Sequence, residues 1–254
     1  MALKLNENGK AYKAYPRRGS APNIEQMPKL ISAGRVPMNN AQFMQKRLDV
    51  RNASEDVKDY WMSNYFDTGD SVIYHPDGKG SWDKLKIDLD SYYLREMNPQ
   101  TRRNWGALIL IPEQYNTIDA EEFTRKQLGK INEGLSKSET KAHPVWKTLA
   151  RDQALLNDYV DLVFTERNYA HAMAVYTDLT HGNLPEMRGW CICSLGDWSD
   201  ICCDEYINSN IGRLIGVKLD SRKNDLGIKA HAMADFPSTD KTRVGLEETL
   251  YSDP

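Results

Sequence analysis

Apolar residues recur at helical spacing in several stretches of the chain. In residues 39–50 an asparagine precedes a run in which Phe43, Met44 and Leu48 share one side, which predicts a helix with an asparagine N-cap. A second helix is expected to begin after Ser54, because two acidic residues fill the turn that follows it.

The clearest helical pattern covers residues 144–166. Pro144 suits the first position of a helix, and apolar residues at three- and four-residue intervals form a stripe along one face. Another helix is expected from Asp119 to about residue 135, since Asp119 and Glu122 resemble a capping pair.

Other apolar runs predict strands. Residues 71–75 lead into Pro-Asp-Gly and alternation resumes at 85–89, so a β-hairpin is expected. The run 106–112 predicts a short strand buried on both faces, and 188–195 and 211–219 predict two more. Three aspartates near the hairpin are interpreted as turn residues rather than as catalytic carboxylates: Asp67, Asp70 and Asp77.

These elements alternate irregularly, without a βαβ rhythm, and this favours an α+β fold. We expect mixed helices, a small and mostly antiparallel sheet, and an extended basic N-terminal arm. Four prolines in the first 40 residues predict an arm with at most short helical turns. The expected domains are the arm with one short helix, residues 1–52, and an acidic α+β body, residues 53–254.

The charge is distributed unevenly between these two parts. The first 51 residues carry ten basic and three acidic groups, a balance of +7, so the rest must carry −10 to give the net −3. A basic segment on an acidic body is typical of chains that contact nucleic acid or the acidic surface of another protein or copy. No run approaches the ~18 apolar residues of a membrane span, and the first residues lack the apolar stretch of a secretory signal. A cytoplasmic protein with no membrane partner is expected.

Aromatic residues stand among the basic ones, and this combination can stack on bases while it neutralises phosphates. We expect phosphate-backbone contacts rather than base reading, because no recognition motif accompanies the pattern. Acidic protein surfaces and a homo-oligomer remain open as alternatives. The candidate partner-binding residues are Lys10, Tyr12, Lys13, Tyr15, Arg17, Arg18, Lys46, Arg47, Arg51, Arg102 and Arg103, with Trp105 beside the last two.

All four cysteines lie between residues 191 and 203. Strand alternation puts Cys191 and Cys193 on one face, but the adjacent Cys202 and Cys203 match no zinc-knuckle spacing. Nearby aspartates should raise the pKa of these thiols, which argues against a catalytic thiolate. We therefore expect reduced, buried cysteines in a core hairpin.

The sequence favours a non-catalytic binding or assembly protein without a cofactor. It has no phosphate-binding glycine motif and no nucleophile elbow. The alternative is a metal-dependent hydrolase or oxygenase that uses His, Asp and Cys residues of 171–235, with zinc as the candidate metal. Its candidate ligands are His171, His181, Cys191 and Cys193.

Overall fold

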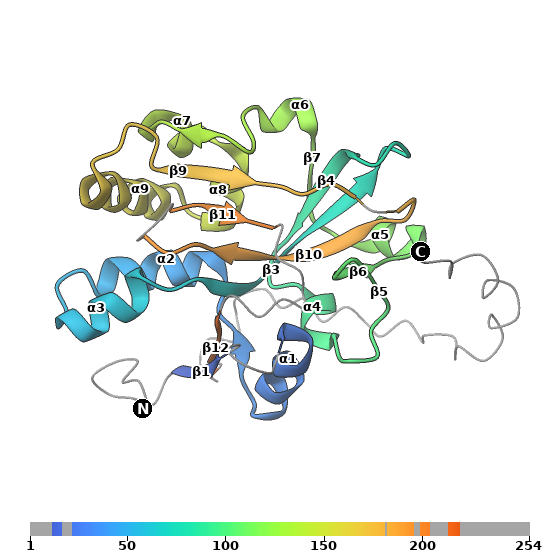
Figure 1. Cartoon of the computed structure of the whole chain (residues 1–254), viewed down its shortest axis with the longest axis horizontal. Helices are drawn as coiled ribbons and strands as arrows, with labels where there is room; N and C mark the ends of the chain where they lie inside the picture. Colours follow the sequence, from blue (N-terminus) through green and yellow to red (C-terminus); the bar gives the residue numbers. More distant parts are fainter. Residues whose placement is uncertain (1–11, 17–21, 181, 196–198, 204–212, 219–254) are drawn as a thin grey trace, which may run out of the picture. The chain divides into compact units, whose positions relative to one another are not determined.

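The computed structural model describes a part of the chain that is shown in colour in Figure 1. The chain divides into two units, Met1–Lys218 and Leu219–Pro254, and every described residue lies in the first. The described residues are 12–16, 22–180, 182–195, 199–203 and 213–218.

Twelve strands of the described residues are joined by hydrogen bonds into one sheet. Its main path runs β1-β12-β3-β10-β11-β9-β8, and the other strands attach at its sides. The strands are β1 (Tyr12–Pro16), β2 (Val36–Pro37), β3 (Phe66–Pro76), β4 (Trp82–Asp88), β5 (Arg103–Asn104), β6 (Ala107–Ile109), β7 (Glu121–Thr124), β8 (Gly134–Leu135), β9 (Met173–Tyr176), β10 (Glu186–Ile192), β11 (Ile201–Cys202) and β12 (Arg213–Val217).

The predicted small, mostly antiparallel sheet is wrong, although the α+β class stands. The sheet is large and mixed, because β12 pairs with β3 and β11 pairs with β9 in parallel. Sequence patterns miss such a sheet for two reasons. Strands of two to four residues are too short to show alternation, and strands buried on both faces have none to show.

The central strands are covered on both faces. In β3, Val72 and Tyr74 belong to one hydrophobic cluster and Ile73, between them, belongs to another. In β12, Leu214 and Ile215 divide in the same way. Figure 1 shows α7, α8 and α9 above β10, and α1 and α4 below it. Each layer of helices therefore closes its own apolar core against the sheet.

Local signals place several helices where they were expected. The helix α2 (Asn40–Asp49) begins after Asn39, whose side chain accepts from Gln42 N while the Gln42 side chain accepts from Asn39 N. The remaining helices are α1 (Asn23–Ser32), α3 (Glu55–Met62), α4 (Tyr92–Glu96), α5 (Pro112–Thr117), α6 (Arg125–Leu128), α7 (Lys137–Ala142), α8 (Pro144–Ala150) and α9 (Gln153–Arg167).

Other helix predictions were wrong. The predicted helix 144–166 is two helices, because Arg151 takes a left-handed conformation (φ 61°) and Asp152 caps α9. The predicted helix 119–135 contains β7, the short α6 and β8. The predicted arm also contains the ten-residue helix α1, which accommodates Pro28 in its interior.

The hairpin prediction is confirmed, and it extends further than expected. β3 pairs with β4 from Ser71 to Pro76, and Asp77 between them accepts from Lys79 N (2.7 Å) and Ser81 N (3.1 Å). Asp67 and Asp70 are not turn residues, because both lie within β3. Among the described residues, none of the helices has the length and apolar character that a membrane crossing requires.

Candidate functional site

A tight hairpin places an aromatic residue and two cations on the surface. β5 and β6 are joined by Trp105 (φ 44°) and Gly106 (φ 75°), so both central residues have positive φ. Such a conformation is rare for a bulky side chain. Trp105 adopts it although its side chain is 68% exposed and little packing within the chain compensates. Arg102 and Arg103 beside it are exposed as well.

The loop that precedes β10 is fixed against the β3–β4 hairpin. Trp82 Nε1 donates to the carbonyl of Asp178 (3.1 Å), and Thr180 Oγ1 donates to the carbonyl of Ser81 (2.7 Å). Between these two anchored residues, Leu179 is 55% exposed. The loop therefore holds an apolar side chain toward solvent between a bonded backbone carbonyl at Asp178 and a bonded side chain at Thr180.

A buried ion cluster connects this loop with the β5–β6 hairpin. Arg188 in β10 is fully buried, with Nη1 3.2 Å from Asp178 Oδ2 and Nη2 3.8 Å from Glu186 Oε2. Asn104 Nδ2 donates to Glu186 Oε1 (3.4 Å), and a Cβ added to Gly182 would lie 3.3 Å from the same Nδ2. The hairpin and the loop are thus held together by polar contacts that include the buried Arg188 and Glu186.

We call Arg102, Arg103, Trp105 and Leu179 the hairpin–loop surface. The exposed Arg125 lies next to the loop's anchor, since its guanidinium is 5.2 Å from the Trp82 ring and Nη1 donates to Ser81 Oγ (3.1 Å). In Figure 1 the β3–β4 tip, the start of β10, and β5 and β6 all lie at the right-hand side.

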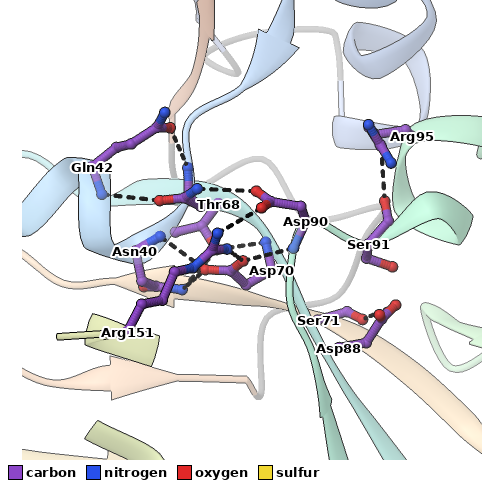
Figure 2. Close-up of polar contacts among 11 residues, drawn as sticks. Asn40, Gln42, Thr68, Asp70, Ser71, Asp88, Asp90, Ser91, Arg95 and Arg151 are labelled. Atoms are coloured by element: carbon purple, nitrogen blue, oxygen red, sulfur yellow. Dashed lines mark hydrogen bonds and ion pairs between the residues drawn. The ribbon is translucent and has the colours of Figure 1, made fainter. Parts of the chain in front are cut away.

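A second polar network, drawn in Figure 2, centres on Asp70, whose side chain is fully buried in β3. Its carboxylate accepts from Arg151 Nη2 (2.7 Å), from the backbone and side-chain nitrogens of Asn40 (both 2.9 Å) and from Asp90 N (2.9 Å). Arg151 also donates to Asp90 Oδ2 (2.6 Å). The network joins the start of α2, β3, the turn after β4 and the break between α8 and α9.

The pKa values of the two carboxyl groups that bond Arg151 shift in opposite directions. Burial raises the pKa of Asp70, and the positive charge of Arg151 offsets only part of that effect. Burial acts in the same sense on Asp90, but the hydrogen bond and charge of Arg151 bring its pKa below the usual value. The difference follows from exposure, since half of the Asp90 side chain is in solvent. We interpret this network as structural, because its charges already satisfy one another.

The cysteines are free and buried, as expected, and they divide between two environments. Cys191, Cys193 and Cys202 form one cluster, with 3.5 Å between the Sγ atoms of Cys193 and Cys202. Cys203 lies elsewhere, with its Sγ 2.6 Å from the hydroxyl of Tyr74. β10 pairs with β11 in antiparallel register, so the predicted core hairpin is present.

The predicted partner-binding residues lie in different environments. Arg47 is fully buried, and its guanidinium donates to four oxygens of the interior, so it is not available to a partner at the surface. Lys46 is half-buried over the Trp61 ring, and Arg51 is exposed. Tyr12, Lys13 and Tyr15 belong to β1, whose backbone pairs with β12. Lys10, Arg17 and Arg18 lie outside the described residues.

Of the candidate metal ligands, Cys191 and Cys193 lie in one cluster with Cys202. His171 is exposed in the turn before β9, and His181 lies outside the described residues. Within the described ranges, no group of three or more His, Cys, Asp or Glu residues is placed to hold a metal ion.

Sequence reasoning found the cations and the tryptophan of the hairpin–loop surface, because they are neighbours in the chain. It missed the buried charges Arg151, Glu186 and Arg188. Arg151 pairs with Asp70 across 81 positions, and Asn104 bonds Glu186 across 82, so no local pattern could indicate these contacts.

Comparison with known proteins supports the fold alone. No protein-family model matches the chain, and no curated protein matches it. A solved structure described as "Accommodation of massive sequence variation in Nanoarchaeota by the C-type lectin fold" is similar, with a TM-score of 0.62 and 13% sequence identity. The match covers 82% of this chain and 98% of that chain. The large mixed sheet therefore resembles a C-type lectin fold.

Proposed function

We propose that this chain is a non-catalytic binding protein that contacts an anionic partner through the hairpin–loop surface. The observation that carries the proposal is the exposed Trp105, presented with Arg102 and Arg103 on a turn of positive φ. Trp and Arg are the residues that most often dominate binding energy at interfaces.

Conformational cost supports this role for Trp105. A non-glycine residue in the left-handed region costs on the order of 1 kcal/mol, and asparagine or glycine would occupy this turn more easily. A large apolar side chain that is mostly in solvent offsets little of that cost through burial in the chain itself. Contact with a partner would bury the ring and recover that energy.

The supporting structure favours recognition by a preformed surface. The cluster of Arg188, Asp178 and Glu186 holds the loop, and Glu186 bonds to Asn104 of the hairpin, so little backbone conformational entropy remains to be lost on binding. The similar solved structure is described as accommodating massive sequence variation on the same kind of fold. A scaffold that tolerates changes of sequence is well suited to carry a binding surface.

The partner's charge can be tested with two defined probes, a fluorescent twenty-nucleotide oligo(dT) and a twenty-residue polyglutamate peptide. We expect the intact chain to bind one of them at low salt, as measured by anisotropy. Trp105→Ser should weaken binding roughly 5- to 150-fold, the range that one stacked base represents. The double change Arg102→Ala with Arg103→Ala should reduce the oligo(dT) salt slope by about 1.4, for two phosphates no longer neutralised.

Matched controls use exposed residues elsewhere. Tyr169 is 63% exposed after α9 and Lys147 is exposed on α8, so Tyr169→Ser and Lys147→Ala should leave affinity within twofold. Binding of oligo(dT) alone would identify a nucleic-acid partner, and binding of the peptide alone an acidic protein surface. If neither probe binds, or if the Trp105 and Tyr169 variants behave alike, the proposal is wrong.

The contribution of the N-terminal residues needs a carefully placed deletion. Removal of residues 2–11 leaves β1 intact, whereas a cut beyond Tyr12 removes a strand that pairs with β12. If residues 2–11 mediate assembly, this deletion should convert an oligomer to a monomer in sedimentation without added nucleic acid.

A further inference from the structure

Three cysteine side chains meet on one face of the β10–β11 pair. Cys191 lies in β10 and Cys193 comes directly after the strand, where Cys193 N donates to the Asp200 carbonyl (2.9 Å) and continues the pairing. The two side chains, two positions apart, therefore point to the same face, and Cys191 lies opposite Cys202 in the register. The Sγ atoms of Cys193 and Cys202 are 3.5 Å apart. Tyr65 and Tyr176 pack against this cluster and are themselves only partly buried.

A cation that bonds to Cys193 is buried without a carboxylate among its hydrogen-bond acceptors. Arg47 donates to the carbonyls of Trp61 (3.0 Å), Asn64 (3.2 Å) and Cys193 (2.8 Å), and to the hydroxyl of Tyr159 (2.7 Å). All four acceptors are uncharged. A buried guanidinium is costly unless an anion balances it, and Arg47 bonds directly to the main chain of a cysteine that can supply one.

The surroundings of Cys193 favour its thiolate. Hydrogen bonds from the thiols of Cys191 and Cys202, with a smaller contribution from Arg47, lower the pKa of Cys193 to about 5. Burial and the nearby Asp200 act in the opposite sense and are outweighed. The pKa of Cys202 is raised well above its usual value, since its proton is the one donated.

We propose that Cys193 and Cys202 form an oxidation site at which a peroxide closes a disulfide between β10 and β11. The Cys193 thiolate attacks one peroxide oxygen, the O–O bond breaks, and a sulfenic acid forms on Cys193 while the departing oxygen takes a proton to leave as water. The sulfur of Cys202 then attacks the sulfenic sulfur, and a second water leaves with the Cys202 proton. Two thiols are oxidised and one peroxide is reduced to two waters.

The short Sγ–Sγ distance brings this pair together, and access favours it over the other cysteines. Bond formation requires the sulfurs to approach from 3.5 Å to roughly 2.05 Å. Cys193 and Cys202 are 7% and 8% exposed, whereas Cys191 is 1% exposed and Cys203 is fully buried. Hydrogen peroxide is small and uncharged, so it is the oxidant suited to such limited access.

Cys203 provides a matched control from the adjacent position. Its Sγ lies 2.6 Å from the Tyr74 hydroxyl and 3.0 Å from the Tyr176 carbonyl. Serine can make both hydrogen bonds, so Cys203→Ser should fold and should leave the oxidation unchanged.

The test treats the native, full-length chain with hydrogen peroxide, blocks remaining thiols with N-ethylmaleimide and maps peptides by mass spectrometry. We expect the intact mass of the treated chain, before blocking, to be lower by two hydrogens. The peptide map should then contain a linked peptide with Cys193 and Cys202. In Cys202→Ser, the reaction should stop at a sulfenic acid on Cys193 that dimedone traps. Circular dichroism before treatment confirms that each variant is folded.

The pH dependence gives a second, independent measurement. The reaction rate should change less than about twofold between pH 6 and 8, whereas an ordinary thiol of pKa 8.5 would speed up roughly eighty-fold. The charged or titratable groups around the cluster that could modify this profile are Arg47, Tyr65, Asp67, Tyr159, Tyr176, Asp200 and the two neighbouring thiols. A rate that rises like that of an ordinary thiol, a disulfide that includes Cys203, or four unmodified thiols after treatment would each overturn the proposal.

Discussion

Replacing Arg151 with methionine tests how the network in Figure 2 contributes to stability. The change removes the guanidinium but keeps an unbranched apolar stem, and Asp70 stays fully buried in β3 without its counter-charge. Arg151 has a left-handed backbone conformation. Arginine and methionine both carry a Cβ, so the backbone strain at this position should be the same in the variant.

The expected loss follows from the enclosure of Asp70. Removal of one partner of a buried ion pair typically costs about 3–5 kcal/mol. Three N–H donors, two from Asn40 and one from Asp90, still reach the Asp70 carboxylate, so we expect the lower end, about 3 kcal/mol. The control Asp90→Asn loses a half-exposed charge and should cost about 1 kcal/mol or less.

Urea unfolding followed by tryptophan fluorescence measures both changes, with Trp146 and Trp190 as buried reporters. The cost of Arg151→Met should shrink as the pH falls toward 4. Burial already raises the pKa of Asp70, and loss of the cation raises it further, so the protonated carboxyl is tolerated in the folded variant. If Arg151→Met and Asp90→Asn cost the same, or the Arg151 effect does not depend on pH, the reasoning about the buried pair fails.

Two further changes test other buried features. Asp200 has a pKa raised to about 7 by burial, so its contribution to stability is fully present below about pH 4 and is lost as the pH rises to 7. Relative to the wild type, Asp200→Asn should therefore gain up to about 4 kcal/mol of unfolding free energy between pH 4 and 7; parallel pH curves would contradict this. Gly69→Ala would place a Cβ 2.9 Å from Pro37 Cγ and 3.2 Å from the Pro37 carbonyl oxygen. It should cost about 1–3 kcal/mol in thermal or urea unfolding, and an unchanged midpoint would show that β2 can move away.

The elements that sequence predicted well are those fixed by their own neighbours in the chain. The capping box of α2 lies within four residues, and the turn at Asp77 bonds only nearby amides. The break between α8 and α9 was missed because Arg151 takes its position from a carboxylate 81 residues away. The arm was misread because the pairing of β1 depends on β12, about 200 residues later.

The pKa of Cys193 in the cysteine cluster could not be predicted from its sequence neighbours either. Along the sequence, Cys193 is close to aspartates, which raise a thiol pKa, and Asp200 does act in that sense. The groups that lower the pKa are two other thiols and Arg47, and Arg47 lies 146 positions away. A pattern of neighbouring charges could not include that cation. Sequence patterns instead placed Arg47 in a surface patch, because arginine side chains are usually exposed.

The pairing of β1 with β12 has a consequence during synthesis of the chain. β1 ends at Pro16, but its partner strand is complete only at Val217. At ordinary translation rates the ribosome needs roughly 10–40 s to add the intervening residues. During that time the hydrogen-bonding edge of β1 has no partner from β12, and the same holds for the part of β3 that later receives β12. The nascent chain is therefore most vulnerable to wrong strand pairing just before its last described strand emerges.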